Sequence, residues 1–321
     1  MSDPPMPTHH GVAVQEEGTY PNETLRLLHQ RRSIRRFKDE KIPRDVLELL
    51  LGAAMNAPSG GNLQAFNIVK IEDPERKGRL MKICGNQRFI GEAPLNLVIC
   101  LDQRRSMRWA ELDVAPFTGL AQIRSFLMGM QLTGIVGQAI CVAADSLGLG
   151  SCYVGTALSK AGEVAEFLEL PIGVFPGVLI SIGYPAGEVP MRKKHRLETL
   201  LHDEVHRDLP DDELHAAYRE KHEPPGAPRV ELTERRLRTL YETCRRVHGE
   251  EFAERSVAHA REQGYINPVQ RYFGLHYKAD SVYNSPNSEF IKVIERQGWS
   301  ICGDYDHPRV NPRHYGTSGP E

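Results

Sequence analysis

The 321-residue sequence predicts an α+β fold in which helices cover a sheet. Three short segments, FNIVKI, PLNLVICLD and FPGVLISIGYP, are rich in β-branched or continuously apolar residues and indicate strands. Segments with helical periodicity alternate with these strands, which is typical of helices packed on a sheet. Beyond the Pro-rich, charged stretch EKHEPPGAPRVE, only helical patterns continue. We therefore expect a sheet-containing core followed by a mainly helical C-terminal extension.

The core elements follow in order along the chain. Residues 1–20 show no periodicity and are expected to form a disordered tail. A short helix should begin after Asn22, a good N-cap residue, and a second helix should cover 42–58, with Pro43 in its first turn and Pro58 at its end. The remaining elements are expected as strands at 66–71 and 94–102, a long helix near 122–147, a short strand at 151–156, a helix at 161–170 and a strand at 175–185.

The second half of the chain is divided by composition. We expect a core domain over 21–209, a linker over 210–229 and an extension over 230–321. One helix should end at Gly249, a second should cover Glu250 to Gln263, and a third should end near Gly298. The first has one apolar face, formed by Leu237, Leu240, Tyr241, Cys244 and Val247. An aromatic group between the helices either lines a substrate pocket or packs the extension onto the core: Tyr265, Tyr272, Phe273, Tyr277 and Tyr283.

The bulk composition excludes several classes of partner. The net charge of -2 gives no case for nucleic acid or an anionic membrane. The start of the chain, MSDPPMPTHHGVAV, has no basic segment followed by an apolar run, so no signal peptide is expected. Six cysteines without a Cys-x-x-Cys pair are ordinary cytoplasmic usage. The apolar segment 126–149 contains Gln131, Gln138 and Asp145, which favours a buried helix over a membrane span.

The stretch RRSIRRF, from Arg31 to Phe37, holds four arginines in seven residues. Guanidinium groups bind phosphate in a bidentate manner, and a serine hydroxyl adds a short donor, so Arg31, Arg32, Ser33 and Arg35 predict an anion site. The alternative is a solvated basic turn, because arginine clusters are common on protein surfaces.

Two further stretches carry polar groups at the ends of predicted elements. In PSGGNLQ, two glycines allow close approach of the backbone, and Asn62 and Gln64 carry amides that suit the edge of a heterocycle. The alternative is a plain glycine-rich turn. Lys193 to Leu197, KKHRL, follows the last predicted strand of the core and adds cationic donors, or is only a charged surface run.

Taken in order, RRSIR, PSGGNLQ, GLGSCYVGT, ISIGYP and KHRL resemble the FMN-dependent nitroreductase family, over roughly residues 22–209. The resemblance implies a three-layer α-β-α sandwich with a mixed central sheet, and an obligate homodimer with FMN at the subunit interface. The glycine-containing helix around Gly129, Gly134, Gly137 and Ala144 would suit that interface; the alternative is a helix buried within one monomer.

The resemblance also implies roles for individual residues. The FMN phosphate, ribityl chain and pyrimidine edge fall to Arg31, Ser33 and Arg35, with Arg32 nearby. The phosphate also falls to Lys194 and Arg196. The loop residues expected along the isoalloxazine ring are Pro58, Ser59, Asn62 and Gln64. Backbone donors at the flavin N5 are expected from Val154, Gly155 and Thr156, and the Thr156 hydroxyl could tune the flavin.

The implied activity is transfer of hydride from NADH or NADPH through FMN to an electron-poor acceptor, such as a nitroaromatic, a quinone or an unsaturated small molecule. No side chain is expected as a catalytic acid or base. Two alternatives stay open: a flavoenzyme specialised for one biosynthetic intermediate (a reductase, dehydrogenase, dehalogenase or flavin-cleaving enzyme), and a non-catalytic flavin-binding or interaction protein.

The sequence departs from the family at two places. The usual Gln-Pro-Trp reads Gln64-Ala65-Phe66, and the extension after Leu209 is outside the recognised pattern, where it is expected to act as a lid over the acceptor. The deiodinase branch is also similar, but its Glu, Tyr and Lys clamp is not visible between Ile99 and Phe126.

Three other patterns do not support a site. GLGSCYVG follows a helix and precedes a strand, which is the reverse of a dinucleotide-binding fingerprint. HDEVH lacks the Glu that directly follows the first His in zinc proteases. The spacing of the cysteines and histidines of the extension is irregular for a zinc site, so no metal is expected: Cys244, His248, Cys302, His307 and His314.

Overall fold

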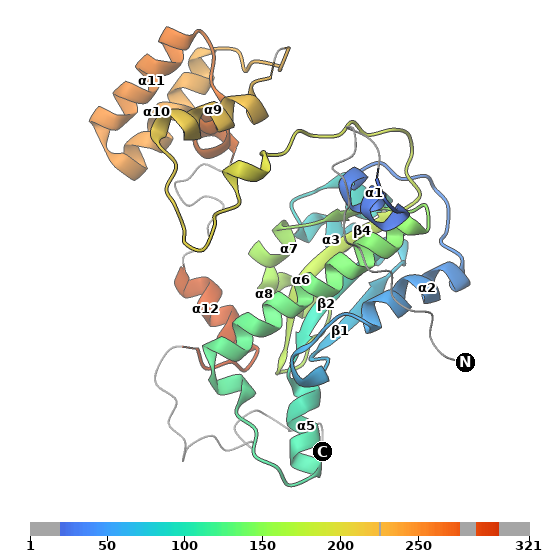
Figure 1. The fold of residues 1–321 in the computed structure, drawn as a ribbon. Coiled ribbons are helices and arrows are strands. Elements are labelled where there is room, and N and C mark those ends of the chain that lie inside the picture. The colour runs from blue at the N-terminus through green and yellow to red at the C-terminus, as the bar shows by residue number, and fades with distance from the viewer. Residues whose placement is uncertain (1–19, 225, 277–286, 302–321) are drawn as a thin grey trace. The chain divides into compact units, whose positions relative to one another are not determined.

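The computed structural model describes residues 20–224, 226–276 and 287–301 (Figure 1). The chain divides into two compact units. The first contains Met1–Pro190 together with Val293–Glu321, and the second contains Met191–Lys292. The division therefore lies before the expected boundary at Leu209, and the last described residues, 293–301, belong to the first unit. The expected N-terminal tail lies outside the described residues.

The first unit is built around a four-stranded sheet with the order β1-β2-β4-β3. Its strands are β1 (Phe66–Ile71), β2 (Leu95–Asp102), β3 (Gly150–Tyr153) and β4 (Val174–Gly183). All three ladders between these strands are antiparallel, with a bulge between Ile99 and Cys100. The four strands therefore form an antiparallel sheet and not the expected mixed one. Among the described residues, parallel pairing is found in one isolated bridge, between Ser33 and Ser151.

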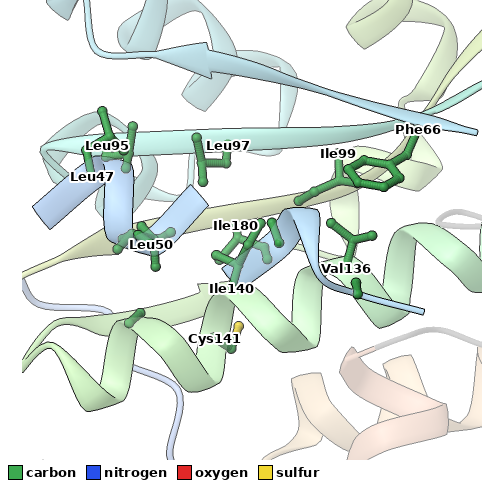
Figure 2. Close-up of a cluster of buried hydrophobic side chains, with 14 of the residues drawn as sticks. Leu47, Leu50, Phe66, Leu95, Leu97, Ile99, Val136, Ile140, Cys141 and Ile180 are labelled. Atoms are coloured by element: carbon green, nitrogen blue, oxygen red, sulfur yellow. The ribbon is translucent and has the colours of Figure 1, made fainter. Parts of the chain in front are cut away.

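One face of the sheet is covered by two helices, α2 (Arg44–Met55) and α6 (Ile123–Ser146). Figure 2 shows Leu50 of α2, Ile140 of α6 and Ile180 of β4 gathered in this layer. All three side chains are fully buried. Removal of this apolar surface from water is the main term that holds the layer together.

The opposite face carries four shorter helices: α3 (Pro74–Ile83), α4 (Arg88–Glu92), α7 (Thr156–Ser159) and α8 (Ala161–Phe167). Leu80, Ile90 and Val164 are buried there against Val98 and Leu179 of the central strands. Every residue of β2 is buried, as expected for a strand covered on both faces. The three-layer α-β-α arrangement is confirmed.

Helix capping follows the sequence signals. Helix α1 (Glu23–Gln30) starts at Asn22, whose Oδ1 accepts a hydrogen bond from the Leu25 N–H at 2.9 Å. Pro43 is the N-cap residue of α2, and that helix ends before Pro58. A further helix, α5 (Arg104–Leu112), follows β2 and was not expected from the sequence.

The small residues of α6 serve packing within the chain. A Cβ at Gly129 would lie 2.2 Å from Leu101 Cδ1, and a Cβ at Gly137 would lie 2.5 Å from the Tyr153 hydroxyl oxygen. Ala144 is also buried in the core. These positions let α6 approach the sheet closely, which favours the alternative of a helix buried within one monomer for this stripe.

Helix α6 is the one helix of the described residues that is long and apolar enough to cross a membrane. A core helix of a soluble protein meets the same criterion, and nine residues of α6 are buried. Its length and composition are therefore explained by its place in the core.

The end of the described chain packs into the first unit. Helix α12 (Asn287–Arg296) leads to Gly298, which has φ +94°. Trp299 is 1% exposed and meets Phe126 and Phe175 edge to face, with ring centroids 5.5 and 6.2 Å apart. The Ser300 N–H donates to the Leu120 carbonyl at 2.8 Å. This segment therefore belongs to the core.

The second unit is helical, which confirms the expected character of the extension. Its helices are α9 (Asp211–His222), α10 (Glu234–His248), α11 (Glu250–Gln263) and the π-helical turn η4 (Gln270–His276). Helix α9 occupies much of the expected linker. Helix α10 ends at Gly249, with φ +89°, and α11 has the expected bounds. The small core of the second unit contains Leu237, Leu240, Ala260 and Ile266.

Two aromatic residues of the extension are used inside the second unit. The Tyr265 hydroxyl donates to Glu223 at 3.1 Å, and the Tyr272 ring meets the His222 ring with centroids 6.2 Å apart. These two rings therefore pack the extension itself, whereas Phe273 is 59% exposed. Tyr277 and Tyr283 lie outside the described residues.

Candidate functional site

The arginine stretch lies along the end of the sheet formed by β3 and β4. The Ile34 N–H donates to the Ser151 carbonyl at 2.9 Å, and the Lys38 N–H donates to the Tyr184 carbonyl at 2.8 Å. Ile34 is buried and closes against Gly150, where a Cβ would lie 2.5 Å from Ile34 Cγ1. The segment is thus anchored at a fixed register, with polar residues on either side of a buried isoleucine.

Arg31 is held beside β3 in a partly buried position. Its Nη2 lies 3.4 Å from Ser151 Oγ, and its Nε lies 3.9 Å from Asp145 Oδ2 at the end of α6. Nε and Oδ2 are both buried and make no hydrogen bond within the described residues. Burial raises the pKa of Asp145 to about 6, against the opposing effect of Arg31 and Arg32. The guanidinium therefore keeps donor capacity that its own surroundings do not use.

Arg31, Ser33 and Arg35 gather around Cys152 of β3. Burial raises the pKa of the Cys152 thiol, while the positive charges of Arg35 and Arg31 and a hydrogen bond with Ser33 act in the opposite direction. The Arg35 guanidinium lies over the Phe89 ring at 5.9 Å. The Arg32 side chain makes a different contact: its Nη1 donates to the Val189 carbonyl at 2.9 Å. Positive charge is therefore concentrated at one end of β3.

The segment after β3 forms the next side of the same region. The Val154 N–H donates to the Leu179 carbonyl at 2.9 Å, so this donor is already used by the sheet. Gly155 is exposed, and a Cβ there would meet nothing within 4 Å. The Thr156 hydroxyl accepts a hydrogen bond from Gln87 Nε2 at 2.8 Å. Gly155 therefore lies on an open surface, whereas the Val154 N–H is used by the sheet.

The loop Pro58 to Gln64 has an unusual backbone. Gly61, Asn62 and Gln64 have φ values of 58°, 53° and 47°. A non-glycine residue in this region costs about 1–3 kcal/mol and persists only where its surroundings enforce it. The Ser59 hydroxyl accepts the Gln64 N–H at 3.2 Å. The Gln64 side chain donates to the Met55 carbonyl at 2.9 Å. Ser59 and Gln64 thus hold the loop shape.

The rigid loop leaves its tip accessible. Arg105 Nη2 donates to the carbonyls of Gln64 and Phe66, the second at 2.9 Å, which fixes the loop from the α5 side. Pro58, Gly60 and Asn62 are exposed, and a Cβ at Gly60 would meet nothing within 4 Å. The loop backbone is therefore held in place by hydrogen bonds and is open to solvent at Gly60.

The predicted residues fall into three places. Arg31, Ser33 and Arg35 lie together with the segment 154–156 around β3. No hydrogen bond, ion pair or ring contact of the described residues joins the loop 58–64 to this group. Lys194 and Arg196 belong to the second unit, where Lys194 is exposed. There Arg196 Nε and Lys193 Nζ contact the Glu220 carboxylate, at 2.8 and 2.9 Å.

Four supporting residues were not expected from the sequence: Ser151, Asp145, Gln87 and Arg105. Ser151 lies within the quoted motif GLGSCYVGT, so its position offered a signal. Asp145, Gln87 and Arg105 have no such pattern. Their partners are distant in the sequence, and only the folded chain brings each pair together.

The other histidine and cysteine patterns are tested only where the structure describes them. No group of three or more His, Cys, Asp or Glu side chains suited to a metal gathers among the described residues. His202 and His206 follow the 3-10 turn Leu197–Thr199 and are not in a helix, and their ring centroids lie 4.7 Å apart. Cys302, His307 and His314 lie outside the described residues.

The comparisons with known proteins agree with this fold. A family model for the nitroreductase family matches residues 28–184. The chain is 32% identical to an FMN reductase [NAD(P)H] of Bacillus subtilis over 194 residues, which cover 60% of this chain and 77% of the relative. It is 31% identical over 198 residues to an oxygen-insensitive NADPH nitroreductase of Salmonella typhimurium, covering 62% of this chain and 80% of that protein.

Solved structures give the same result. The hypothetical oxidoreductase YcnD of Bacillus subtilis superposes with a TM-score of 0.67 at 26% identity, covering 87% of this chain and 99% of that one. The NADPH:FMN oxidoreductase of Vibrio harveyi, solved with NAD⁺, shares the fold with a TM-score of 0.63, covering 87% of this chain and 99% of its own, at 21% identity. The sequence match over most of its relatives' length and the shared fold place this chain in the nitroreductase family.

Proposed function

We propose that this protein is an FMN-dependent NAD(P)H oxidoreductase that reduces an electron-poor small molecule by a ping-pong mechanism. The observation that carries the proposal is the partly buried Arg31, which Ser151 and Asp145 hold beside β3, together with the positive charge of Arg35 near the same strand. The names of the relatives, an FMN reductase and an NADPH nitroreductase, support the same assignment.

The residues around β3 fit the phosphate end of FMN. A phosphate is a strong acceptor for charge-assisted hydrogen bonds, and Ser151 and Asp145 hold the Arg31 guanidinium in place beside β3. Ser33 supplies a hydroxyl, and Arg35 supplies a second guanidinium. Lys194 and Arg196 are proposed as further phosphate ligands.

The loop 58–64 fits the ring of FMN. Its exposed glycine edge allows a flat ligand to approach the backbone, and Asn62 offers an amide to polar ring atoms. Because Ser59, Gln64 and Arg105 already fix the loop, little ordering is needed when a ligand binds. Gly155 and Thr156 are proposed as the backbone donors near the flavin N5.

FMN, when bound, supplies the electron transfer between the nicotinamide and the acceptor. The chain binds and orients the reactants, and its cationic side chains and backbone N–H groups stabilise negative charge that develops at the ring. No acid or base side chain is assigned. In flavoenzymes the cofactor commonly carries the chemistry, and the protein positions the reactants and stabilises charge.

We propose a homodimer in which each FMN contacts residues of both chains. The separation of the loop 58–64 from the group around β3 supports this, because a second chain could supply the missing side. Apolar side chains exposed on α6 also support it: Ile123, Leu127, Met128 and Ile135. The site is proposed to act in the cytoplasm on small molecules, without nucleic acid or membrane partners.

The first test is the visible spectrum of the purified protein, followed by anaerobic addition of NADH and then NADPH. Flavin bands that bleach on addition support the proposal and give the donor preference. A colourless protein that also fails to take up added FMN contradicts it. Steady-state turnover with quinone and nitro acceptors separates a broad reductase from an enzyme specialised for one intermediate, and from a flavin-binding protein without turnover.

The second test is a matched pair of arginine variants, Arg31→Gln and Arg36→Gln. Arg31 is partly buried at the proposed phosphate site, whereas the Arg36 side chain is exposed in the same segment. Loss of a charged hydrogen bond costs about 1.5–3 kcal/mol, so Arg31→Gln should weaken FMN binding by about 10- to 150-fold. Fluorescence titration with FMN measures this, and equal affinities of the two variants would contradict the assignment.

A further inference from the structure

The turn between α3 and α4 holds the side chain of Thr156 from two sides. A Cβ at Gly85 would lie 3.7 Å from Thr156 Cγ2, so the methyl group lies beside this glycine. Gln87 Nε2 lies 2.8 Å from Thr156 Oγ1. Gly85 and Asn86 have φ values of 77° and 56°, a left-handed backbone that reverses the chain before Gln87. The side chain of Thr156 is therefore held by a turn that comes 69 residues earlier in the sequence.

The hydrogen bonds of Gln87 fix which end of its amide faces Thr156. The same Nε2 atom lies 3.0 Å from the Cys84 carbonyl oxygen. A carbonyl oxygen only accepts hydrogen bonds, so the amide atom beside it must be the nitrogen and not the oxygen. Rotating the amide by half a turn would place two oxygen atoms together at Cys84. Both hydrogens of the amide nitrogen are therefore used, one by Cys84 and the other by Thr156.

This arrangement leaves the hydrogen of the Thr156 hydroxyl for another partner. A hydroxyl has one hydrogen and two lone pairs, and Gln87 donates to one of the lone pairs, so the hydrogen points away from Gln87. The hydrogen bonds of the described residues include none that the Thr156 hydroxyl donates. Gly155 beside it is exposed, and a Cβ there would meet nothing within 4 Å. The surface next to this donor is therefore open to a ligand.

We infer that Gln87 is a positioning residue, which directs the Thr156 hydroxyl to donate a hydrogen bond to the ring of bound FMN. The inference rests on the proposed function, in which Thr156 lies near the flavin N5. A donor at the ring stabilises the negative charge of the reduced cofactor more than it stabilises the neutral oxidised form, and so favours reduction. Gln87 acts through Thr156 and not by its own contact with the ring.

The test compares Gln87→Met, Thr156→Val and the double variant in the full-length protein loaded with FMN. Gln87→Met keeps the length of the side chain but removes the amide, and Thr156→Val keeps the shape but removes the hydroxyl. Anaerobic titration against a redox dye of known potential gives the equilibrium ratio of reduced to oxidised FMN, and fluorescence titration gives the FMN affinity. The Thr156→Val background is the matched control, because it contains no hydroxyl for Gln87 to position.

We expect Thr156→Val to lower the ratio of reduced to oxidised FMN by about 2- to 10-fold, the range of one hydrogen bond. Gln87→Met should lower it by at least about 2-fold, because the hydroxyl remains but is free to rotate. The double variant should match Thr156→Val. An unchanged ratio in either single variant overturns the inference. A further loss when Gln87→Met is added to Thr156→Val also overturns it, and shows that Gln87 contacts the flavin directly.

Two additional results separate the inference from protein folding and from the proposed function. Gln87→Asn, whose amide is one methylene too short to reach Thr156, replaces Gln87→Met if that variant does not fold, and the same loss is expected. A wild-type chain that binds no FMN contradicts the proposed function and the inference together. A wild-type chain whose FMN is bleached by NADH or NADPH, but whose ratio does not respond to the Gln87 variants, contradicts the inference alone.

Discussion

The two units of this chain differ in how much apolar surface they bury. The first buries nearly every residue of β2 and β4 between two helical layers. The second has a small core of Leu237, Leu240, Ala260 and Ile266, and several of its polar contacts are exposed ion pairs. The first unit therefore buries a large amount of apolar surface, whereas the second unit buries little apolar surface. The family model covers residues of the first unit, whereas the solved structures cover 87% of the chain, so the shared fold extends beyond the unit with the larger core.

The largest expected effect tests whether the C-terminal segment is a true part of the first unit. Trp299→Ala removes a fully buried ring and should lower the free energy of unfolding by about 3–5 kcal/mol. Trp109→Ala, at the other tryptophan of the chain, which is 48% exposed, should change it by less than about 1 kcal/mol. Urea unfolding followed by circular dichroism measures both. Similar losses in the two variants would place Trp299 outside the core.

The next effect tests the second unit. Leu240→Ala should destabilise it by about 2–4 kcal/mol, because Leu240 is 1% exposed in a small cluster. Hydrogen exchange should then speed up in α10 and α11 while β2 and β4 stay protected. Leu214→Ala, at an exposed residue of α9, is the control. Equal loss of protection in both units would show that they unfold as one.

A smaller effect concerns Asp145 in the first unit. Its pKa is raised to about 6 by burial, so its ionised form is disfavoured in the folded chain. The favourable contribution is present in full below the unfolded pKa, near 4, and is lost as the pH rises through about 6. Asp145→Asn should therefore raise the free energy of unfolding by about 1–2 kcal/mol at pH 8 and by little at pH 4. Urea titrations at the two pH values check this, with the exposed Asp113→Asn as control, and a gain confined to pH 4 would reverse the assignment.

The smallest effect concerns the ion pairs of the second unit. Lys193 and Arg196 lower the pKa of Glu220 through hydrogen bonds, but the Glu220 side chain is partly exposed and both cations are exposed, so water and salt screen the attraction. Glu220→Gln should leave the thermal midpoint at pH 7 within experimental error. A drop of several degrees would mean that charges, and not the apolar cluster, hold this unit together.

Local elements could be predicted because each has its signal in adjacent residues. The strand 66–71 follows from its β-branched residues, and the first helix follows from Asn22 as its cap. The buried strand β2 follows from a continuous apolar run. The α+β class and the helical extension could be derived in the same way.

Features that depend on distant contacts could not be predicted. Trp299 packs against Phe126 and Phe175, and nothing near Trp299 in the sequence indicates those partners. The same holds for Asp145 beside Arg31 and for Arg105 beneath the loop 58–64. For the candidate site, the resemblance supplied which residues to consider, and the structure supplied which of them lie together.

The position of Trp299 also affects how the chain is made. The ribosome synthesises the sheet strands first, and the ring that packs against Phe126 and Phe175 emerges only after the second unit. The apolar surface formed by Phe126 and Phe175 stays uncovered while the second unit is translated. A chain that stops before Trp299 would keep this apolar site exposed to chaperones and proteases, so the core of the first unit is complete only after the second unit has been translated.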